Sequence, residues 1–150
     1  MRKIDKLIED NQDKLEDIIV PQTPYTLMDY IHGRCQVFAQ ALHEELGYEL
    51  EFFWDHGYWF DDDDYPSTVL VHAYCILPKG VPFKGKYVDA RGALSKRMMQ
   101  QEYEYSIPLY EKYSIDRLEE DYKQNILEQP TKEEIKAVRN YIRENINKYK

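Results

Sequence analysis

The sequence predicts an α+β fold in which a helix that begins near Cys35 packs on an antiparallel sheet. Apolar side chains recur at helical spacing over residues 37–46, and Gly47 supplies the stop signal that commonly follows a helix. Residues 67–77 are rich in β-branched and aromatic side chains and are closed by a proline and a glycine, which is typical of a strand. These two segments favour a mixed architecture.

Length and charge narrow the class of protein. A chain of 150 residues is expected to form one domain, residues 1–150, with a hydrophobic core of its own. Its two cysteines, Cys35 and Cys75, are too few for a disulfide framework, so we expect a reducing, cytoplasmic setting. No apolar stretch is long enough for a membrane span, and the formal charge of −8 argues against binding to a nucleic-acid backbone. The expected protein is soluble and acidic.

Three strands are expected in the sheet. Residues 48–54 alternate so that Leu50, Phe52 and Trp54 face inward, and residues 85–89 form a short strand that ends in a carboxylate. The strand over residues 67–77 is expected to lie in the centre of the sheet. The period of two predicts that His72 and Cys75 point to opposite faces, with Leu70 beside His72 and Val71 beside Cys75.

Helices are expected to flank this core at both ends of the chain. Residues 2–19 read as an amphipathic helix that two prolines then end. Further helices are predicted over residues 93–103, over residues 114–124, and from Pro130 to the C-terminus, where Thr131 and Glu134 have the spacing of a capping box. No chemistry is assigned to these helices.

Residues 55–66 combine aromatic side chains with four consecutive acids, residues 61–64, and are expected to form a surface loop. Repulsion between neighbouring carboxylates disfavours a compact element there. The loop lacks the alternating acids, the glycine and the closing glutamate of an EF-hand, so no metal is assigned to it.

Cys35, His72 and Asp89 are the candidate catalytic residues. A thiol in the first turn of a helix is the expected nucleophile, because unpaired N–H groups and the helix dipole lower its pKa. Neutral His72 on the central strand would accept its proton, and Asp89 would orient the other ring nitrogen. Cys75 is expected to be a poor partner for His72 because it lies on the opposite strand face.

Three short motifs carry a resemblance to a known family. Gly33-x-Cys35 at a helix start, His72-Ala73-Tyr74 on a strand, and Tyr87-Val88-Asp89 on the next strand resemble the transglutaminase-like branch of the papain-like cysteine enzymes. The resemblance covers residues 33–92. It departs from that group at Gln36, where a tryptophan often follows the cysteine.

The resemblance implies a papain-like core and acyl transfer through a thioester at Cys35. Such an enzyme would act on an amide-bearing protein, peptide or small molecule by hydrolysis, deamidation or transamidation, and it would need no cofactor. Small cytoplasmic enzymes of this kind occur in bacteria and their phages. Gln22 is upstream of Cys35, as is the glutamine that stabilises the oxyanion in papain-like enzymes, although a polar turn residue is the favoured interpretation.

Two alternatives stay open. The same fold can serve as a catalytically idle binding or inhibitor module that uses the acidic residues 55–64 through charge complementarity. Cys35, His72 and Asp89 are also acceptable zinc ligands, with His32 or water in the fourth position.

Overall fold

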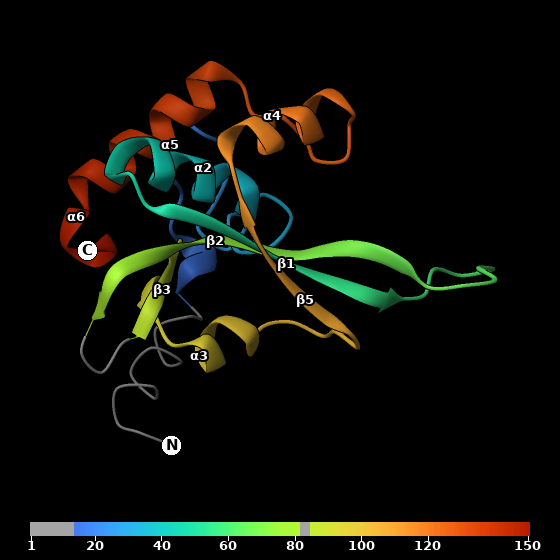
Figure 1. Cartoon of the computed structure of the whole chain (residues 1–150). Helices are drawn as coiled ribbons and strands as arrows, with labels where there is room; N and C mark the ends of the chain where they lie inside the picture. The colour runs from blue at the N-terminus through green and yellow to red at the C-terminus, as the bar shows by residue number, and fades with distance from the viewer. Residues whose placement is uncertain (1–13, 82–84) are drawn as a thin grey trace.

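A computed structural model describes residues 14–81 and 85–150 and shows a mixed α+β fold built on a five-stranded antiparallel sheet (Figure 1). The strand order is β4-β3-β2-β1-β5, so β2 is central, as predicted. The strands are β1 (Glu49–Tyr58), β2 (Ser67–Val81), β3 (Gly85–Asp89), β4 (Gly92–Leu94) and β5 (Pro108–Tyr113). The helices are the 3₁₀ turn η1 (Leu15–Asp17), α2 (Cys35–Leu46), α3 (Lys96–Gln100), α4 (Ile115–Lys123), α5 (Lys132–Glu144) and α6 (Ile146–Tyr149).

Helix α2 begins and ends where the sequence predicts. Gly33 adopts a left-handed φ of 79°, which turns the chain into the helix. At the other end Gly47, with φ 72°, donates its N–H to the carbonyl oxygen of His43 and closes the last turn. The helix packs on β2, where the Cys75 thiol donates to the carbonyl oxygen of Ala39 at 3.3 Å.

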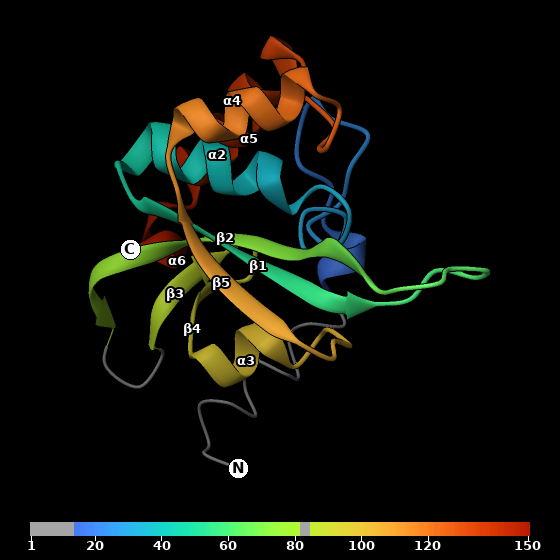
Figure 2. The same ribbon diagram turned by 45° about the vertical axis from the view of Figure 1, so that its right-hand side comes forward.

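The sheet is covered on both faces (Figure 2). Helices α2, α4 and α5 lie above it, and α3 lies below it. The larger apolar cluster includes Val37, Phe38 and Leu42 of α2, and the smaller one joins Phe53 and Tyr74 to Met98 and Met99. Full burial of side chains of this size contributes about 1.5–3 kcal/mol each, so α3 is held firmly despite its short length.

A β-bulge at Val71 changes the predicted faces of β2. Phe53 pairs with His72, but the next residue of β1, Trp54, pairs with Leu70, so Val71 is an extra residue. The prediction for residues 70 and 71 was therefore wrong: Leu70 packs against the α2 cluster, and Val71 packs in the α3 cluster. From His72 onward the predicted alternation holds, with Cys75 against α2.

The predicted loop begins later than expected. Strand β1 continues to Tyr58, and only residues 59–66 connect it to β2. Asp55 is 3% exposed, because its carboxylate accepts N–H groups of Gly57, Ser106 and Ile107 and is fully satisfied inside the fold. The acids at residues 61, 62 and 64 are exposed as predicted, and Asp63 is half-buried.

The helices outside α2 agree with the predictions in part. Most of the predicted helix over residues 2–19 lies outside the described residues; of the rest, Leu15–Asp17 is a 3₁₀ turn and Ile19 forms an isolated bridge with Thr26. The helix predicted for residues 93–103 is shortened to α3, because β4 takes its first residues and the Ser95 side chain caps the helix there. Helices α4 and α5 begin after Ser114 and Thr131, whose hydroxyls accept helix N–H groups.

Among the helices of residues 14–81 and 85–150, none has the length and apolar character needed to cross a lipid bilayer.

Candidate active site

Cys35 is the first residue of α2 and lies against β2. Its side chain is buried, with 4% of the residue exposed. The Sγ atom accepts the backbone N–H of Ala73 at 3.3 Å and lies 3.9 Å from the side-chain oxygen of Gln36. The thiol therefore contacts the residue that directly follows His72 on the central strand.

Burial raises the pKa of the Cys35 thiol to about 11, although the Ala73 N–H acts in the opposite direction. The expected depression of this pKa is thus wrong for the conformation observed. The N–H groups at the helix start stabilise a thiolate, but this stabilisation is smaller than the solvation free energy that a buried thiolate loses. The thiol is neutral at physiological pH.

His72 and Asp89 form the pair that the sequence predicts. The Nε2 atom of His72 lies 2.8 Å from Oδ2 of Asp89, and neither side chain is appreciably exposed. Burial lowers the pKa of His72, against the attraction of Asp89. A neutral ring donates its proton from Nε2 to the carboxylate, which leaves Nδ1 as an acceptor.

Arg91 holds the Asp89 carboxylate in place, a role that the sequence did not reveal. Its Nη2 and Nε atoms lie 2.6 and 3.1 Å from Oδ2 of Asp89, and its backbone N–H also donates to that carboxylate. Burial alone would raise the pKa of Asp89, but the Arg91 guanidinium and the His72 ring hold it well below its usual range. Asp89 is therefore ionised, and its position relative to His72 is fixed.

Tyr103 occupies the other nitrogen of His72. Its hydroxyl lies 2.9 Å from Nδ1 of His72 and 2.9 Å from the carbonyl oxygen of Ile31. With neutral His72 the hydroxyl donates to Nδ1; with a protonated ring it accepts from Nδ1 and donates to Ile31. Both ring nitrogens are thus engaged, and neither contact is to Cys35. Residue spacing gave no signal for Tyr103, which follows α3 by three residues.

The structure therefore brings Cys35, His72 and Asp89 into one buried region but joins only the last two by a hydrogen bond. Cys35 contacts the backbone beside His72 instead of its ring. The ring nitrogen that does not contact Asp89, Nδ1, is contacted by the Tyr103 hydroxyl.

Helix α5 anchors the turn that precedes Cys35. Arg34 donates from Nε to Oε2 of Glu134 at 2.9 Å, and its Nη2 pairs with the other carboxylate oxygen. Tyr30 donates to the same Oε2 at 2.8 Å, and Glu128 pairs with Nη1 of Arg34 at 2.9 Å. One half of the predicted capping box forms, since the Thr131 hydroxyl accepts the Glu134 N–H at 3.1 Å; the Glu134 side chain binds Arg34 instead, because Arg34 is the stronger partner for a buried carboxylate.

Helix α6 supports the turn that follows Asp89. The Tyr149 hydroxyl donates to the carbonyl oxygen of Ala90 at 2.9 Å. A side chain at Gly92 would meet the backbone oxygen of Lys148 at 2.9 Å, so α6 lies directly on this turn. The C-terminal helices, to which the sequence assigned no chemistry, position both halves of the candidate site.

The other candidate residues lie away from the thiol's contacts. Gln22 is exposed and borders a small cavity with Ala137 and Tyr141 of α5. His32 has its Nε2 3.6 Å from Glu102 and its ring 5.4 Å from that of Tyr103. Within residues 14–81 and 85–150, no group of three or more His, Cys, Asp or Glu side chains is arranged to hold a metal ion, so the zinc alternative gains no support.

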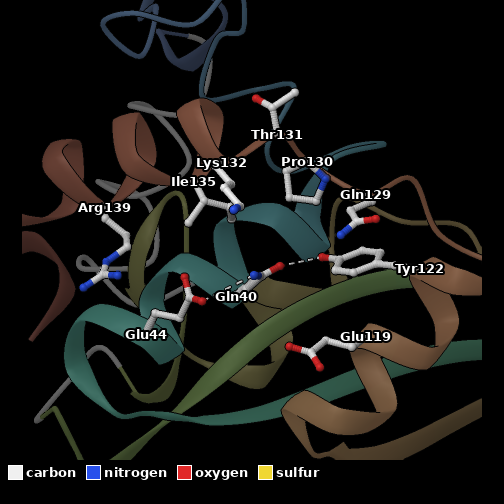
Figure 3. A pocket seen from close by; sticks show the side chains of 10 residues that line it. All are labelled: Gln40, Glu44, Glu119, Tyr122, Gln129, Pro130, Thr131, Lys132, Ile135 and Arg139. Atoms are coloured by element: carbon white, nitrogen blue, oxygen red, sulfur yellow. Dashed lines mark hydrogen bonds between the residues drawn. The ribbon is translucent and has the colours of Figure 1, made fainter.

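A separate groove of about 240 Å³ lies between α2, α4 and α5 (Figure 3). The Tyr122 hydroxyl donates across it to the side-chain oxygen of Gln40 at 2.8 Å. The groove has charges of both signs, among them Glu44, Glu119 and Arg139, and none of the three candidate catalytic residues lines it.

Comparisons of the chain with protein-family models, with curated proteins and with solved structures found no match.

Proposed function

We propose that this protein is a cysteine-dependent hydrolase or acyl-transferase with a transglutaminase-like, papain-like core, acting through a thioester at Cys35. The observation that carries the proposal is the buried hydrogen bond between His72 and Asp89, one residue from the backbone N–H that contacts the Cys35 sulfur. Thiol acyl transfer uses a histidine oriented by an ionised carboxylate, and the His72–Asp89 pair supports the proposal on that point.

The proposed reaction gives Cys35, His72 and Asp89 separate roles. Nδ1 of His72 takes the proton of the Cys35 thiol, and the sulfur bonds to the carbonyl carbon of an amide. The carbon–nitrogen bond then breaks, and the leaving amine takes the proton from the imidazolium. Water attacks the thioester to give an acid, or a second amine attacks it to give a new amide; the carbon–sulfur bond breaks, and His72 takes the proton of the attacking group and returns it to the Cys35 sulfur. Asp89 stabilises the imidazolium throughout.

The state described here is closed in this proposal. Nδ1 of His72 is bound to Tyr103, and the thiol has a pKa of about 11. Turnover requires Tyr103 to release the ring and the substrate to reach the sulfur. Two free, buried cysteines fit a reducing compartment, and we infer a cytoplasmic protein.

A catalytically idle binding module is the second candidate, and the Tyr103 contact favours it. In that case His72, Asp89, Arg91 and Tyr103 form a buried polar network that only stabilises the fold. The neutral, enclosed thiol would then be a small core residue.

Acylation by p-nitrophenyl acetate separates the two candidates, because it needs no knowledge of the substrate. We expect an acetyl group on Cys35, located by peptide mass spectrometry, and none on Cys75, which is buried against α2. His72→Ala should abolish the adduct, and Asp89→Asn should slow its formation. Equal acetylation of both cysteines, or a rate unchanged by His72→Ala, would instead establish the idle module.

A further inference from the structure

Half of the central strand is paired on one side only. Strand β2 pairs with β1 from Ser67 onward, but its ladder with β3 includes only Cys75, Ile76 and Val81. Among the described residues, no backbone hydrogen bond joins residues 67–72 of β2 to any segment other than β1. The next N–H on the unpaired side, that of Ala73, donates to the Cys35 sulfur.

This unpaired edge connects two distinct places. At the Ala73 end lies the candidate nucleophile. At the Ser67 end, β1 and β2 continue as a two-stranded arm that projects beyond the helices and the rest of the sheet (Figures 1 and 2). The edge therefore runs from the tip of the arm to the thiol.

The tip of the arm combines exposed aromatic rings with acids. Tyr58, Trp59, Phe60 and Tyr65 are 44%, 58%, 51% and 74% exposed. Residues 61–64 between them are all aspartates, within a chain of net charge −8. Exposed Trp and Tyr are enriched where proteins bind partners, and the aspartates select a partner of positive charge.

We propose that the substrate of the candidate site is an extended polypeptide that adds to β2 as a further strand, with a basic end at the arm tip and its reacting amide at Cys35. The inference rests on the proposed function for the identity of the reacting group. Backbone groups of residues 67–72 supply the ladder, as in other cases of strand addition. At about 3.3 Å per residue, a bound segment of about seven residues spans the distance from tip to thiol.

Tyr103 lies at the Cys35 end of the unpaired edge of β2. Its hydroxyl joins His72 of β2 to Ile31, which precedes α2. A strand that extends along β2 as far as Ala73 has to displace this contact. Peptide binding therefore also favours the release of Nδ1 in the proposal.

The test uses the full chain with Cys35→Ala, so that no reaction occurs during binding. The probes are two acetylated, amidated heptapeptides with alternating valine and threonine, two arginines at one end and glutamine at the other, in forward and reverse order. One matched peptide carries glutamates in place of the arginines, and another is N-methylated at alternate backbone nitrogens. Affinity is measured by Trp fluorescence, and the site is mapped by amide hydrogen exchange.

We expect slower exchange at residues 67–72 with one of the arginine peptides. Binding should weaken at least tenfold with the glutamate peptide, with the N-methylated peptide, and with the arginine peptide when residues 61–64 are changed from Asp to Asn. Absence of protection along β2 with both orders, or protection that survives N-methylation, would overturn the proposal. Protection of β2 without acylation of wild-type Cys35 would support strand addition and contradict the enzymatic function. Acylation of Cys35 without protection of β2 would support the enzymatic function and contradict strand addition.

Discussion

The Tyr103 hydroxyl lies 2.9 Å from Nδ1 of His72, so the nitrogen that acid–base catalysis needs is already bound inside the protein. Removing the hydroxyl should free this nitrogen while the ring keeps its packing. We predict that Tyr103→Phe increases the rate of Cys35 alkylation by iodoacetamide severalfold at neutral pH. It should also cost about 1–2 kcal/mol of unfolding free energy, because His72 and Ile31 lose a buried partner.

Tyr113→Phe is the matched control for this prediction. The Tyr113 hydroxyl donates to Asp121 at 2.8 Å, between β5 and α4, and makes no contact with His72. A similar loss of stability is expected there with no change in thiol reactivity. Equal alkylation rates in the two variants would show that Tyr103 does not restrict the site.

Glu134→Gln should destabilise the protein strongly. Arg34 is 8% exposed, and removing one partner of a buried ion pair costs about 3–5 kcal/mol. We expect the low end of that range in urea denaturation, because Glu128 still pairs with Arg34. Glu133→Gln, an exposed neighbour in the same helical turn, should leave stability within about 0.5 kcal/mol of wild type. Comparable effects of both changes would contradict the anchoring role of Glu134.

Stability should fall in two stages on acidification. The folded pKa of His72 lies below that of an unfolded histidine, about 6.5, so the unfolded state binds more protons and stability decreases as the pH drops below that value. The folded pKa of Asp89 is also depressed; its contribution is complete above the unfolded value of about 4 and is lost as the pH falls further.

Melting temperatures measured from pH 8 to pH 3 test this profile. His72→Gln should remove the first stage, between about pH 6.5 and 5, where no other buried histidine contributes in the described chain. His56→Gln, at an exposed position on the arm, should keep the wild-type profile. A wild-type melting temperature that is constant from pH 7 to 5 would mean that folding does not lower the pKa of His72.

The acids of the arm should differ sharply from Asp55 at its base. Changing residues 61–64 from Asp to Asn should leave the melting temperature unchanged or slightly raised, since it relieves repulsion between neighbouring charges. Asp55→Asn should lower the free energy of unfolding by about 1–3 kcal/mol. Both carboxylate oxygens accept backbone N–H groups, and the substitution replaces one of these oxygens with an NH₂ group, which cannot accept them. Calorimetry of the two variants tests both expectations, and an equal change in melting temperature would contradict the difference between Asp55 and the acids of the arm.

Local signals in the sequence predicted the elements that carry the candidate triad. Apolar spacing and Gly47 located α2, and a run of β-branched residues located β2. The bulge at Val71 could not be predicted, because it depends on how β1 and β2 align across the sheet. The burial of Asp55 depends in the same way on the N–H groups of Ser106 and Ile107, far along the chain.

The same limit applies to the chemistry of the site. The helix start at Cys35 is a local feature and favours a thiolate, but the pKa of the thiol is decided by enclosure, which depends on the whole fold. Tyr103 reaches His72 through tertiary packing, and no residue spacing predicts it, whereas Arg91 binds Asp89 from two residues along the chain, a local contact that the sequence did not reveal. The paired His72 and Asp89 were predictable because they lie on adjacent strands.

The anchoring of Arg34 by Glu134 has a consequence for the order of events during synthesis. Glu134 is translated 100 residues after Arg34, which at a rate of 5–20 residues per second is a delay of roughly 5–20 s. Throughout that interval the turn before Cys35 lacks its buried counter-charge, and the Ala90 turn lacks Tyr149. A nascent chain on the ribosome therefore holds Arg34, the residue before Cys35, without its buried carboxylate partner until α5 has emerged.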